Sequence, residues 1–220
     1  MSKQVLVVGL GQFGLSLVRS LEDTGVEVLA VDLRGELVAM AAEFATEAIR
    51  ADTTDESALL RLAPGSRDVC VCAIGTESRE ASIITTALMS QMGASRILAR
   101  ATDQLHERIL RMVGAHEIIN PEIEYGRRLA TSIAYEGVLG EYSLNEGVSI
   151  TELKIPPAFV GKNLLELALP RRFGITVVAV QREGKTLASV NPNEPLTADD
   201  LLIVVGQSGR AAKLMDQVGH

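Results

Sequence analysis

The stretch VLVVGLGQFGLSLVRSLEDTGVEVLAVD, residues 5–32, decides the fold of this 220-residue chain. It opens with four apolar residues and continues with a G-x-G-x-x-G pattern made by Gly9, Gly11 and Gly14. An apolar, helix-like run follows, and a second short apolar run ends in Asp32. A glycine pattern between a strand and a helix, with an acidic residue at the end of the next strand, is typical of a nucleotide-binding βαβ unit.

Each residue of this pattern has a physical role in that unit. Gly9 lets the chain turn sharply off the strand, Gly11 lets a phosphate approach the backbone, and Gly14 lets the helix pack on the sheet. Phosphates would meet the N–H groups of the helix N-terminus, where the helix dipole favours negative charge. Asp32 would accept hydrogen bonds from ribose hydroxyls. The alternative is a structural turn with an incidental aspartate, and the context favours the nucleotide site.

The composition indicates a protein built on aliphatic side chains. Hydrophobic residues make up 47% of the chain but aromatic residues only 3%, as expected for a parallel sheet covered by helices. The formal net charge is −7 and no basic block occurs, which argues against a nucleic-acid partner. No signal peptide and no apolar run of about 18 residues is recognisable. We therefore expect a soluble, cytoplasmic protein whose membrane association goes through a partner.

The two cysteines, Cys70 and Cys72, lie in an apolar run that is expected to form a buried strand. Two residues apart, they point to one face of the sheet and are poorly placed to bridge each other. Two thiols without further ligands make no metal site, so both are expected to be small core residues. The three histidines are scattered, and the sequence assigns them no role.

Strands and helices alternate through the first half of the chain. The strands are expected at residues 5–8, 28–31, 46–51, 68–74, 96–100 and 117–120. A capping box at Thr53 and Glu56 is expected to begin the helix after the third strand. This series predicts an α/β fold, a Rossmann-like, doubly wound parallel sheet with right-handed crossovers.

Ligands of such sheets bind at the carboxyl ends of the strands, near the point where the strand order reverses. The residues expected there, besides the glycine loop, are Asp32, Asp52, Thr53, Ile74, Gly75, Glu77 and Arg100. Asp52 could meet the amino group of adenine or cap its own turn, and Arg100 could neutralise a phosphate or remain a solvated charge. Arg34 suggests a ribose 2′-phosphate, but Asp32 would repel that group, so an unphosphorylated ribose is favoured.

The second half of the chain has a different pattern. Residues 121–140 are expected to form a helix that covers the sheet or crosses to another subunit, and residues 140–147 an interdomain joint. Shorter strands at residues 149–155, 175–181, 186–190 and 201–205 follow, with helices at residues 163–168 and 210–218. We therefore expect a nucleotide-binding domain at residues 1–140 and a small α+β domain at residues 141–220. A domain of that size is barely large enough to be stable alone, which makes pairing with a second copy plausible.

Taken together, the two halves resemble the cytoplasmic gating subunits of bacterial potassium-uptake systems, the KtrA/TrkA family. These proteins join an RCK (regulator of potassium conductance) N-domain to an RCK C-domain. In the first half the resemblance rests on VVGLGQFG (7–14), VLAVD (28–32), ADTTDE (51–56), CAIGTE (72–77), ILARA (97–101) and VGAHEIINPE (113–122). In the second half it rests on FVGKNLLEL (159–167), FGITVVAVQREG (173–184) and DDLLIVVG (199–206).

The resemblance implies a regulatory role without catalysis. Such subunits form homodimers that assemble into an octameric ring beneath a membrane-embedded potassium channel or transporter subunit of the TrkH/KtrB type. A nucleotide, ATP or ADP in KtrA-like members and NAD(H) or ATP in TrkA-like ones, changes the shape of the ring and so the potassium flux. By position, the nucleotide pocket comprises Gly9, Gly11, Gln12, Phe13, Gly14, Asp32, Asp52, Thr53, Ile74, Gly75, Glu77 and Arg100. Glu122 matches an acidic residue that helps to hold a cation near the nucleotide phosphates.

The sequence departs from the family pattern at two positions. Many KtrA-like loops carry arginine after the second glycine, whereas this chain has Gln12, as TrkA-like loops do. This leaves NAD(H), ADP and AMP open and weakens the case for sensing the γ-phosphate of ATP. Members that bind cyclic di-AMP have an arginine where this chain has Pro170, with Arg171 and Arg172 beside it. Cyclic di-AMP in the C-domain is therefore left open but not favoured.

Two other function classes can be compared with the gating subunit. An NAD-dependent oxidoreductase would need a group for proton transfer, and no His–carboxylate or Tyr-x-x-x-Lys arrangement is recognisable. A nucleotide-sensing transcription factor would need a basic recognition helix, which the acidic chain does not offer. The sequence therefore predicts a nucleotide-binding regulatory subunit of potassium transport.

Overall fold

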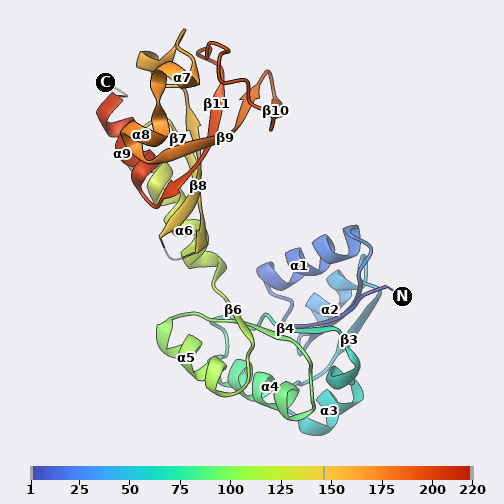
Figure 1. Ribbon diagram of the computed structural model, residues 1–220. Coiled ribbons are helices and arrows are strands. Elements are labelled where there is room, and N and C mark those ends of the chain that lie inside the picture. The colour runs from blue at the N-terminus through green and yellow to red at the C-terminus, as the bar shows by residue number, and fades with distance from the viewer. Residues whose placement is uncertain (1, 146, 219–220) are drawn as a thin grey trace. The chain divides into compact units, whose positions relative to one another are not determined.

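A computed structural model describes residues 2–145 and 147–218 of the chain. The chain forms two compact units, Met1–Asn120 and Pro121–His220, and each is described by itself (Figure 1).

The first unit is built on a six-stranded sheet in which every neighbouring pair of strands is parallel. Its strands are β1 (Gln4–Val8), β2 (Glu27–Asp32), β3 (Glu47–Arg50), β4 (Val69–Cys72), β5 (Ile97–Arg100) and β6 (Glu117–Ile119). The order β3-β2-β1-β4-β5-β6 reverses between β1 and β4, which is the doubly wound arrangement. The predicted α/β fold class is thereby confirmed for this unit.

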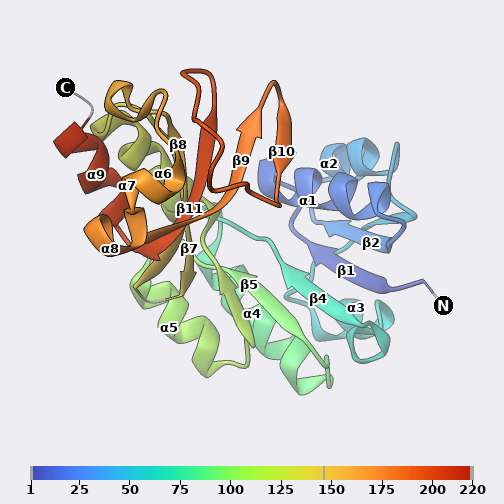
Figure 2. The same cartoon turned by 45° about the horizontal axis from the view of Figure 1, so that its top comes forward.

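Helices cover both faces of this sheet (Figure 2). They are α1 (Gln12–Asp23), α2 (Gly35–Ala41), α3 (Glu56–Arg61), α4 (Arg79–Gln91) and α5 (Gln104–Met112), with a short 3-10 helix, η1 (Pro64–Ser66). Side chains of β1 alternate between the faces: Val5 and Val7 pack with α1 and α2, whereas Leu6 and Val8 pack with α3 and α4. The sheet is therefore buried on both faces. Burial of each such side chain stabilises the fold by about 1.5–3 kcal/mol.

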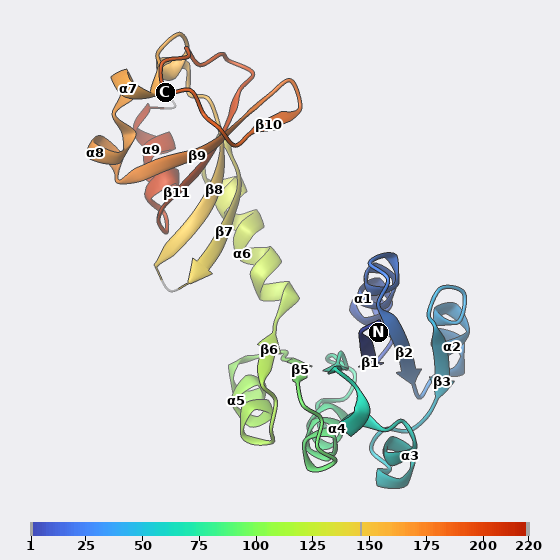
Figure 3. The same cartoon turned by 45° about the vertical axis from the view of Figure 1, so that its right-hand side comes forward.

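The second unit is a five-stranded antiparallel sheet with helices, seen in Figure 3. Its elements are α6 (Pro121–Ala134), β7 (Val138–Asn145), β8 (Val148–Lys154), η2 (Pro157–Phe159), α7 (Leu164–Leu167), α8 (Leu169–Phe173), β9 (Ile175–Arg182), β10 (Lys185–Leu187), β11 (Leu201–Gln207) and α9 (Arg210–Val218). The strand order is β10-β9-β11-β8-β7, and α9 packs against β7 and β11. The core includes Leu153, Leu202 and Leu214, each no more than 1% exposed.

A buried ion pair ties the end of β9 to the turn before β11. The guanidinium of Arg182 donates to both carboxylate oxygens of Asp200, with both nitrogen–oxygen distances 2.7 Å. Asp200 is fully buried and also accepts the backbone N–H of Thr197 at 2.8 Å. These hydrogen bonds lower the pKa of Asp200 to about 2, and the bonds from Arg182 have the largest effect.

The junction of the two units differs from the sequence-based expectation. The helix expected at residues 121–140 ends at Ala134, and the joint expected at residues 140–147 is wrong, because β7 occupies most of it. Strand β7 pairs with β8 from Val138 to Asn145, so the expected boundary between residues 140 and 141 falls inside a strand. The two compact units instead divide between Asn120 and Pro121.

Candidate nucleotide-binding site

The glycine loop joins β1 to α1, and two of its glycines are required by the fold. Gly9 has φ +93°, and a Cβ there would lie 2.7 Å from the backbone nitrogen of Ile74. A Cβ on Gly14 would collide with the carbonyl oxygen of Gly9. The loop is therefore pressed against the end of β4 on one side and against its own helix on the other.

Gly11 is the exception, because no atom lies within 4 Å of the position that its Cβ would take. Gly11 is also the N-cap of α1 and offers no side chain to the first-turn N–H groups, while α3, α4 and α5 are capped by Asp55, Ser78 and Asp103. The first turn of α1 contains no acidic residue either, and Gln12 in that turn is exposed. An open backbone at an uncapped, 12-residue helix is the arrangement that binds phosphate.

We predict that Gly11→Ala and Gly14→Ala have opposite effects. The alanine at position 11 should fold, at a helix-cap cost of about 1 kcal/mol or less, but weaken ADP binding at least tenfold because its methyl group occupies the phosphate approach. The alanine at position 14 should destabilise the protein by about 3 kcal/mol through the collision with Gly9. Calorimetric titration of the two variants measures their affinity for ADP, and thermal unfolding measures their stability. A Gly11→Ala protein that binds ADP like the wild type would contradict the phosphate assignment.

Asp32, at the end of β2, holds the glycine loop in place. Its side chain is buried, with 7% of the residue exposed, and its Oδ2 accepts the backbone N–H of Leu10 at 2.7 Å. Its Oδ1 accepts the backbone N–H of Arg34 at 2.8 Å. The carboxylate therefore stands beside the loop, where the ribose of a bound nucleotide would need an acceptor.

Arg34 and Glu77 join this carboxylate. Arg34 Nε lies 3.3 Å from Asp32 Oδ1, and its terminal nitrogens lie 3.3 and 3.0 Å from the two oxygens of Glu77. The hydrogen bond to Asp32 raises the pKa of the Arg34 guanidinium. The sequence suggested Arg34 only as a phosphate ligand, because nothing local showed that Glu77, after β4, is its partner.

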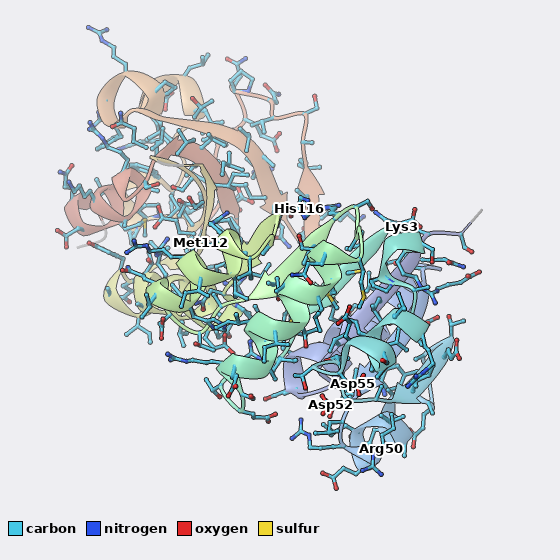
Figure 4. All side chains as sticks on the ribbon, turned by 90° about the horizontal axis from the view of Figure 1, so that it is seen from below. Lys3, Arg50, Asp52, Asp55, Met112 and His116 are labelled. Atoms are coloured by element: carbon cyan, nitrogen blue, oxygen red, sulfur yellow. The ribbon has the colours of Figure 1, made fainter. Side chains whose placement is uncertain are left out.

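Asp52 and Thr53 follow β3, at the same carboxyl edge of the sheet. Figure 4 shows Arg50 and Asp52 at this edge, far from Lys3 and His116 at the amino ends of β1 and β6. The backbone N–H and the hydroxyl of Thr54 both donate to Asp52 Oδ1, at 3.0 and 2.6 Å. These two hydrogen bonds lower the pKa of Asp52. Of the two roles left open for Asp52, the structure therefore displays the turn cap.

Thr53 faces the interior of the first unit. It is buried, and its hydroxyl lies 2.8 Å from that of Thr85 in α4. The capping box expected at Thr53 and Glu56 is wrong: Asp55 caps α3 instead, accepting the backbone N–H of Ala58 at 3.0 Å. Thr53 therefore anchors the loop to α4 through its side chain.

Phe13, Gly75 and Arg100 come together beside the start of α1. The Arg100 guanidinium lies 5.6 Å from the centre of the Phe13 ring. A Cβ on Gly75 would lie 2.8 Å from Arg100 Nη1, so this glycine makes room for the guanidinium. Ile74, next to it, is half-buried and contacts Gly9 through its backbone. The structure thus places a positive charge near the uncapped helix end, as a phosphate site requires.

Glu122 lies in the first turn of α6, in the second unit. Within residues 2–145 and 147–218, no group of three or more His, Cys, Asp or Glu side chains could hold a metal ion. A single carboxylate is too few ligands for a divalent cation, so the described residues do not by themselves make a cation site around Glu122.

The two cysteines and His106 are buried, whereas His116 is exposed. Both cysteines are core residues, as the sequence predicted. Burial raises the pKa of Cys70 to about 12 and also raises that of Cys72, so both stay protonated thiols at neutral pH. His116 Nδ1 accepts the backbone N–H of Ile97 at 3.0 Å, and His106 Nδ1 that of Thr102 at 3.3 Å. His220 lies outside the described residues. Both described histidines thus accept a backbone N–H through Nδ1, His116 at the start of β5 and His106 two residues beyond its end.

The second unit has a cavity of about 420 Å³ between α7, α8 and β9. It is lined by Leu164, Leu165, Ala168, Leu169, Pro170, Arg171, Thr176, Val177 and Pro192. Pro170 lies in the wall, and Arg171 is the one cation among these lining residues. Arg172 lies over the ring of Phe173, at 5.1 Å from its centre.

The fold and this site define a Rossmann-like protein with a dinucleotide-type glycine loop, continued by a small antiparallel-sheet domain. Residues 5–121 match the TrkA-N domain, and residues 150–219 match the TrkA-C domain. The chain belongs to the TrkA-N family, and the predicted family resemblance is confirmed.

Its curated relatives include potassium-uptake proteins of similar length. Ktr system potassium uptake protein C of Bacillus subtilis (strain 168) is 34% identical over 220 residues, which cover 100% of this chain and 99% of the relative. Ktr system potassium uptake protein A of Vibrio alginolyticus is 34% identical over 210 residues, which cover 96% of this chain and 95% of the relative.

Solved structures share the fold over the whole chain. The GsuK channel superposes with a TM-score of 0.71 at 19% identity, covering 100% of this chain and 40% of that chain. The GsuK RCK domain superposes with a TM-score of 0.68 at 19% identity, covering 100% of this chain and 48% of that chain. In the part of this chain that the structure describes, every helix is too short or too polar to traverse a bilayer.

Proposed function

We propose that this chain is a nucleotide-binding regulatory subunit of a potassium uptake system. The observation that carries the proposal is the end-to-end similarity to Ktr potassium uptake proteins, together with the uncapped N-terminus of α1 beside Asp32. The proposed role is regulatory and not catalytic: both cysteines are buried, and Nδ1 of each described histidine accepts a backbone N–H.

The ligand that fits the site is an adenine nucleotide, ATP, ADP or NAD(H). Asp32 would take the ribose hydroxyls, Gly11 and the N–H groups of α1 the phosphates, and Arg100 part of the phosphate charge. The GsuK channel, with the same fold, has been solved bound to NAD. Gln12 at the helix start brings no charge for a γ-phosphate. A divalent cation at Glu122 would need ligands from the nucleotide or another copy, and cyclic di-AMP is not favoured because Arg171 alone would meet its two phosphates.

The partner of this chain is a membrane-embedded potassium channel or transporter subunit of the TrkH/KtrB type. On the cytoplasmic side of the membrane, homodimers of the chain would assemble into an octameric ring against it. A nucleotide shifts such a ring only if it binds two ring conformations with different affinity, because equal affinity shifts nothing. Nucleotide exchange would thereby change the potassium flux.

We predict that adenine nucleotides stabilise the full-length chain. A ligand at 100 times its Kd stabilises the native state by about 2.7 kcal/mol, which raises the melting temperature by several degrees. Differential scanning fluorimetry with ATP, ADP, AMP, NAD⁺, NADH and cyclic di-AMP measures this, with Gly11→Ala as the control, whose shift should be about half of the wild-type shift or less. Rubidium uptake by vesicles that contain a KtrB-type subunit and this chain then tests the regulation. If no adenine nucleotide shifted the wild type, the site assignment would fail, and an uptake that ignored the bound nucleotide would refute the regulatory function.

A further inference from the structure

Arg34 and Glu77 form a two-pronged ion pair. Arg34 Nη1 lies 3.3 Å from Glu77 Oε1 and Nη2 lies 3.0 Å from Oε2, so the planar guanidinium faces the planar carboxylate with two parallel contacts. The third nitrogen, Nε, lies 3.3 Å from Asp32 Oδ1. All three side-chain nitrogens of Arg34 therefore meet carboxylate oxygens.

This ion pair crosses the end of strand β1. Arg34 follows β2 and Glu77 follows β4, and these two strands are the neighbours of β1 on either side. All three strands run in the same direction, so their carboxyl ends share one edge of the sheet. The pair consequently stands over the place where the glycine loop leaves β1, next to the carboxylate that would hold the ribose.

The position of Arg34 matters because of the chemistry of the ribose 2′ position. In dinucleotide sites of this fold, an acidic residue after the second strand binds a free 2′-hydroxyl, and a nearby arginine accommodates a 2′-phosphate. Here the two are only two residues apart, yet the fork that would grip a phosphate is occupied by Glu77. Arg50 aside, the side chains of Asp32, Glu77 and Arg34 together carry one net negative charge, which opposes a 2′-phosphate.

We propose that Glu77 is a specificity-determining residue, which excludes 2′-phosphorylated nucleotides by keeping Arg34 engaged. This inference rests on the proposed function and adds to it the residue that enforces the preference for an unmodified ribose. Removing the Glu77 charge releases the guanidinium fork while Asp32 still holds Nε, and the freed fork then binds the 2′-phosphate.

Arg50 is the other cation at this part of the edge. Its Nε donates to the carbonyl of Leu33 at 2.9 Å, and its side chain packs over Gly35. A carbonyl does not neutralise a guanidinium, so Arg50 could in principle meet a 2′-phosphate as well. The combination of Glu77 and Arg34 variants separates the two arginines, since only Arg34 is released by a change at Glu77.

The test compares ADP with 2′-phosphoadenosine 5′-diphosphate, which differ by the 2′-phosphate alone, by calorimetric titration of the full chain. The wild type should prefer ADP, and Glu77→Gln should shift the affinity ratio about tenfold toward the 2′-phosphorylated ligand. The double variant Glu77→Gln with Arg34→Gln should return the ratio to that of the wild type. Glu36→Gln, which removes an exposed carboxylate from the first turn of α2, is the charge-matched control and should leave the ratio unchanged.

Three results would overturn the inference: a wild type that prefers the 2′-phosphate, an equal shift in Glu36→Gln, or a shift that persists in the double variant. The last result would assign the 2′-phosphate to Arg50. Failure of the proposed function is a separate result, because the wild type would then bind neither ligand.

Discussion

Asp32→Ala is expected to weaken binding of ADP about 100-fold. A hydrogen bond to a charged group contributes about 1.5–3 kcal/mol, and the carboxylate is placed to accept from two ribose hydroxyls, so about 3 kcal/mol of binding is lost. The same carboxylate holds the Leu10 N–H at 2.7 Å, and the alanine leaves this donor without its acceptor. We therefore also expect a loss of about 1–3 kcal/mol in stability, without loss of the fold. Calorimetric titration and circular dichroism measure the two effects.

Two further variants separate ribose recognition from the stability of the loop. Asp32→Asn keeps one oxygen to accept from Leu10 but turns an NH₂ group toward the Arg34 donors, so it should lose less stability than Asp32→Ala while ADP affinity still falls. Asp52→Asn changes an exposed carboxylate whose amide oxygen can keep the turn with Thr54, and it should bind ADP normally. The ribose assignment would be abandoned if Asp32→Asn bound ADP as tightly as the wild type does. A loss of affinity in Asp52→Asn would instead place adenine at Asp52.

The first unit could be predicted from sequence because its signals are local. The central strands β1, β2, β4 and β5 contain short apolar runs. Alternating strands and helices leave few topologies other than a doubly wound sheet. The glycine loop is equally local, since Gly9, Gly11 and Gly14 lie within six residues of each other in one turn. The fold class and the family were therefore recoverable before any coordinates.

The junction of the units was not predictable in the same way. Helix α6 buries none of its described side chains, so its apolar spacing gave no sign of where packing ends. Strand β7 contains Gly140 and several polar residues, and it forms because β8 follows in a hairpin and pairs with it. A strand stabilised by its partner gives a weak signal in its own residues.

The candidate site shows the same division between local and non-local signals. Asp32 ends a recognisable strand, so its place beside the loop could be inferred from spacing. The ion pair between Arg34 and Glu77 joins residues 43 positions apart, and no pattern in the chain connects them. The sequence shows that Arg34 is charged. That Glu77 neutralises this charge could be recognised only from the strand order β2-β1-β4, which brings the two residues together.

Asp200→Asn is expected to destabilise the second unit by about 3 kcal/mol, because breaking a buried ion pair leaves one partner without its counter-charge. Arg182 is 26% exposed at its side chain and keeps contacts with Glu194 and the Pro195 carbonyl, which places the loss at the lower end of the usual range. Tyrosine fluorescence during urea unfolding of the full chain isolates this unit. The chain has no Trp, and its three tyrosines, Tyr125, Tyr135 and Tyr142, all lie beyond residue 120.

The same substitution should change the response of the second unit to acid. Asp200 has a pKa of about 2 in the folded protein, below its usual 3.8, so the unfolded state binds more protons between these values. Its stabilising contribution is therefore fully present above about pH 4 and is lost as the pH falls toward 2. The difference between wild type and Asp200→Asn should be largest at neutral pH and shrink below pH 4. Asp199→Asn, which changes the adjacent and exposed carboxylate, is the matched control and should unfold like the wild type at every pH. A stability difference that stayed constant from pH 7 to pH 3 would show that the lost energy comes from packing and not from the Arg182 ion pair.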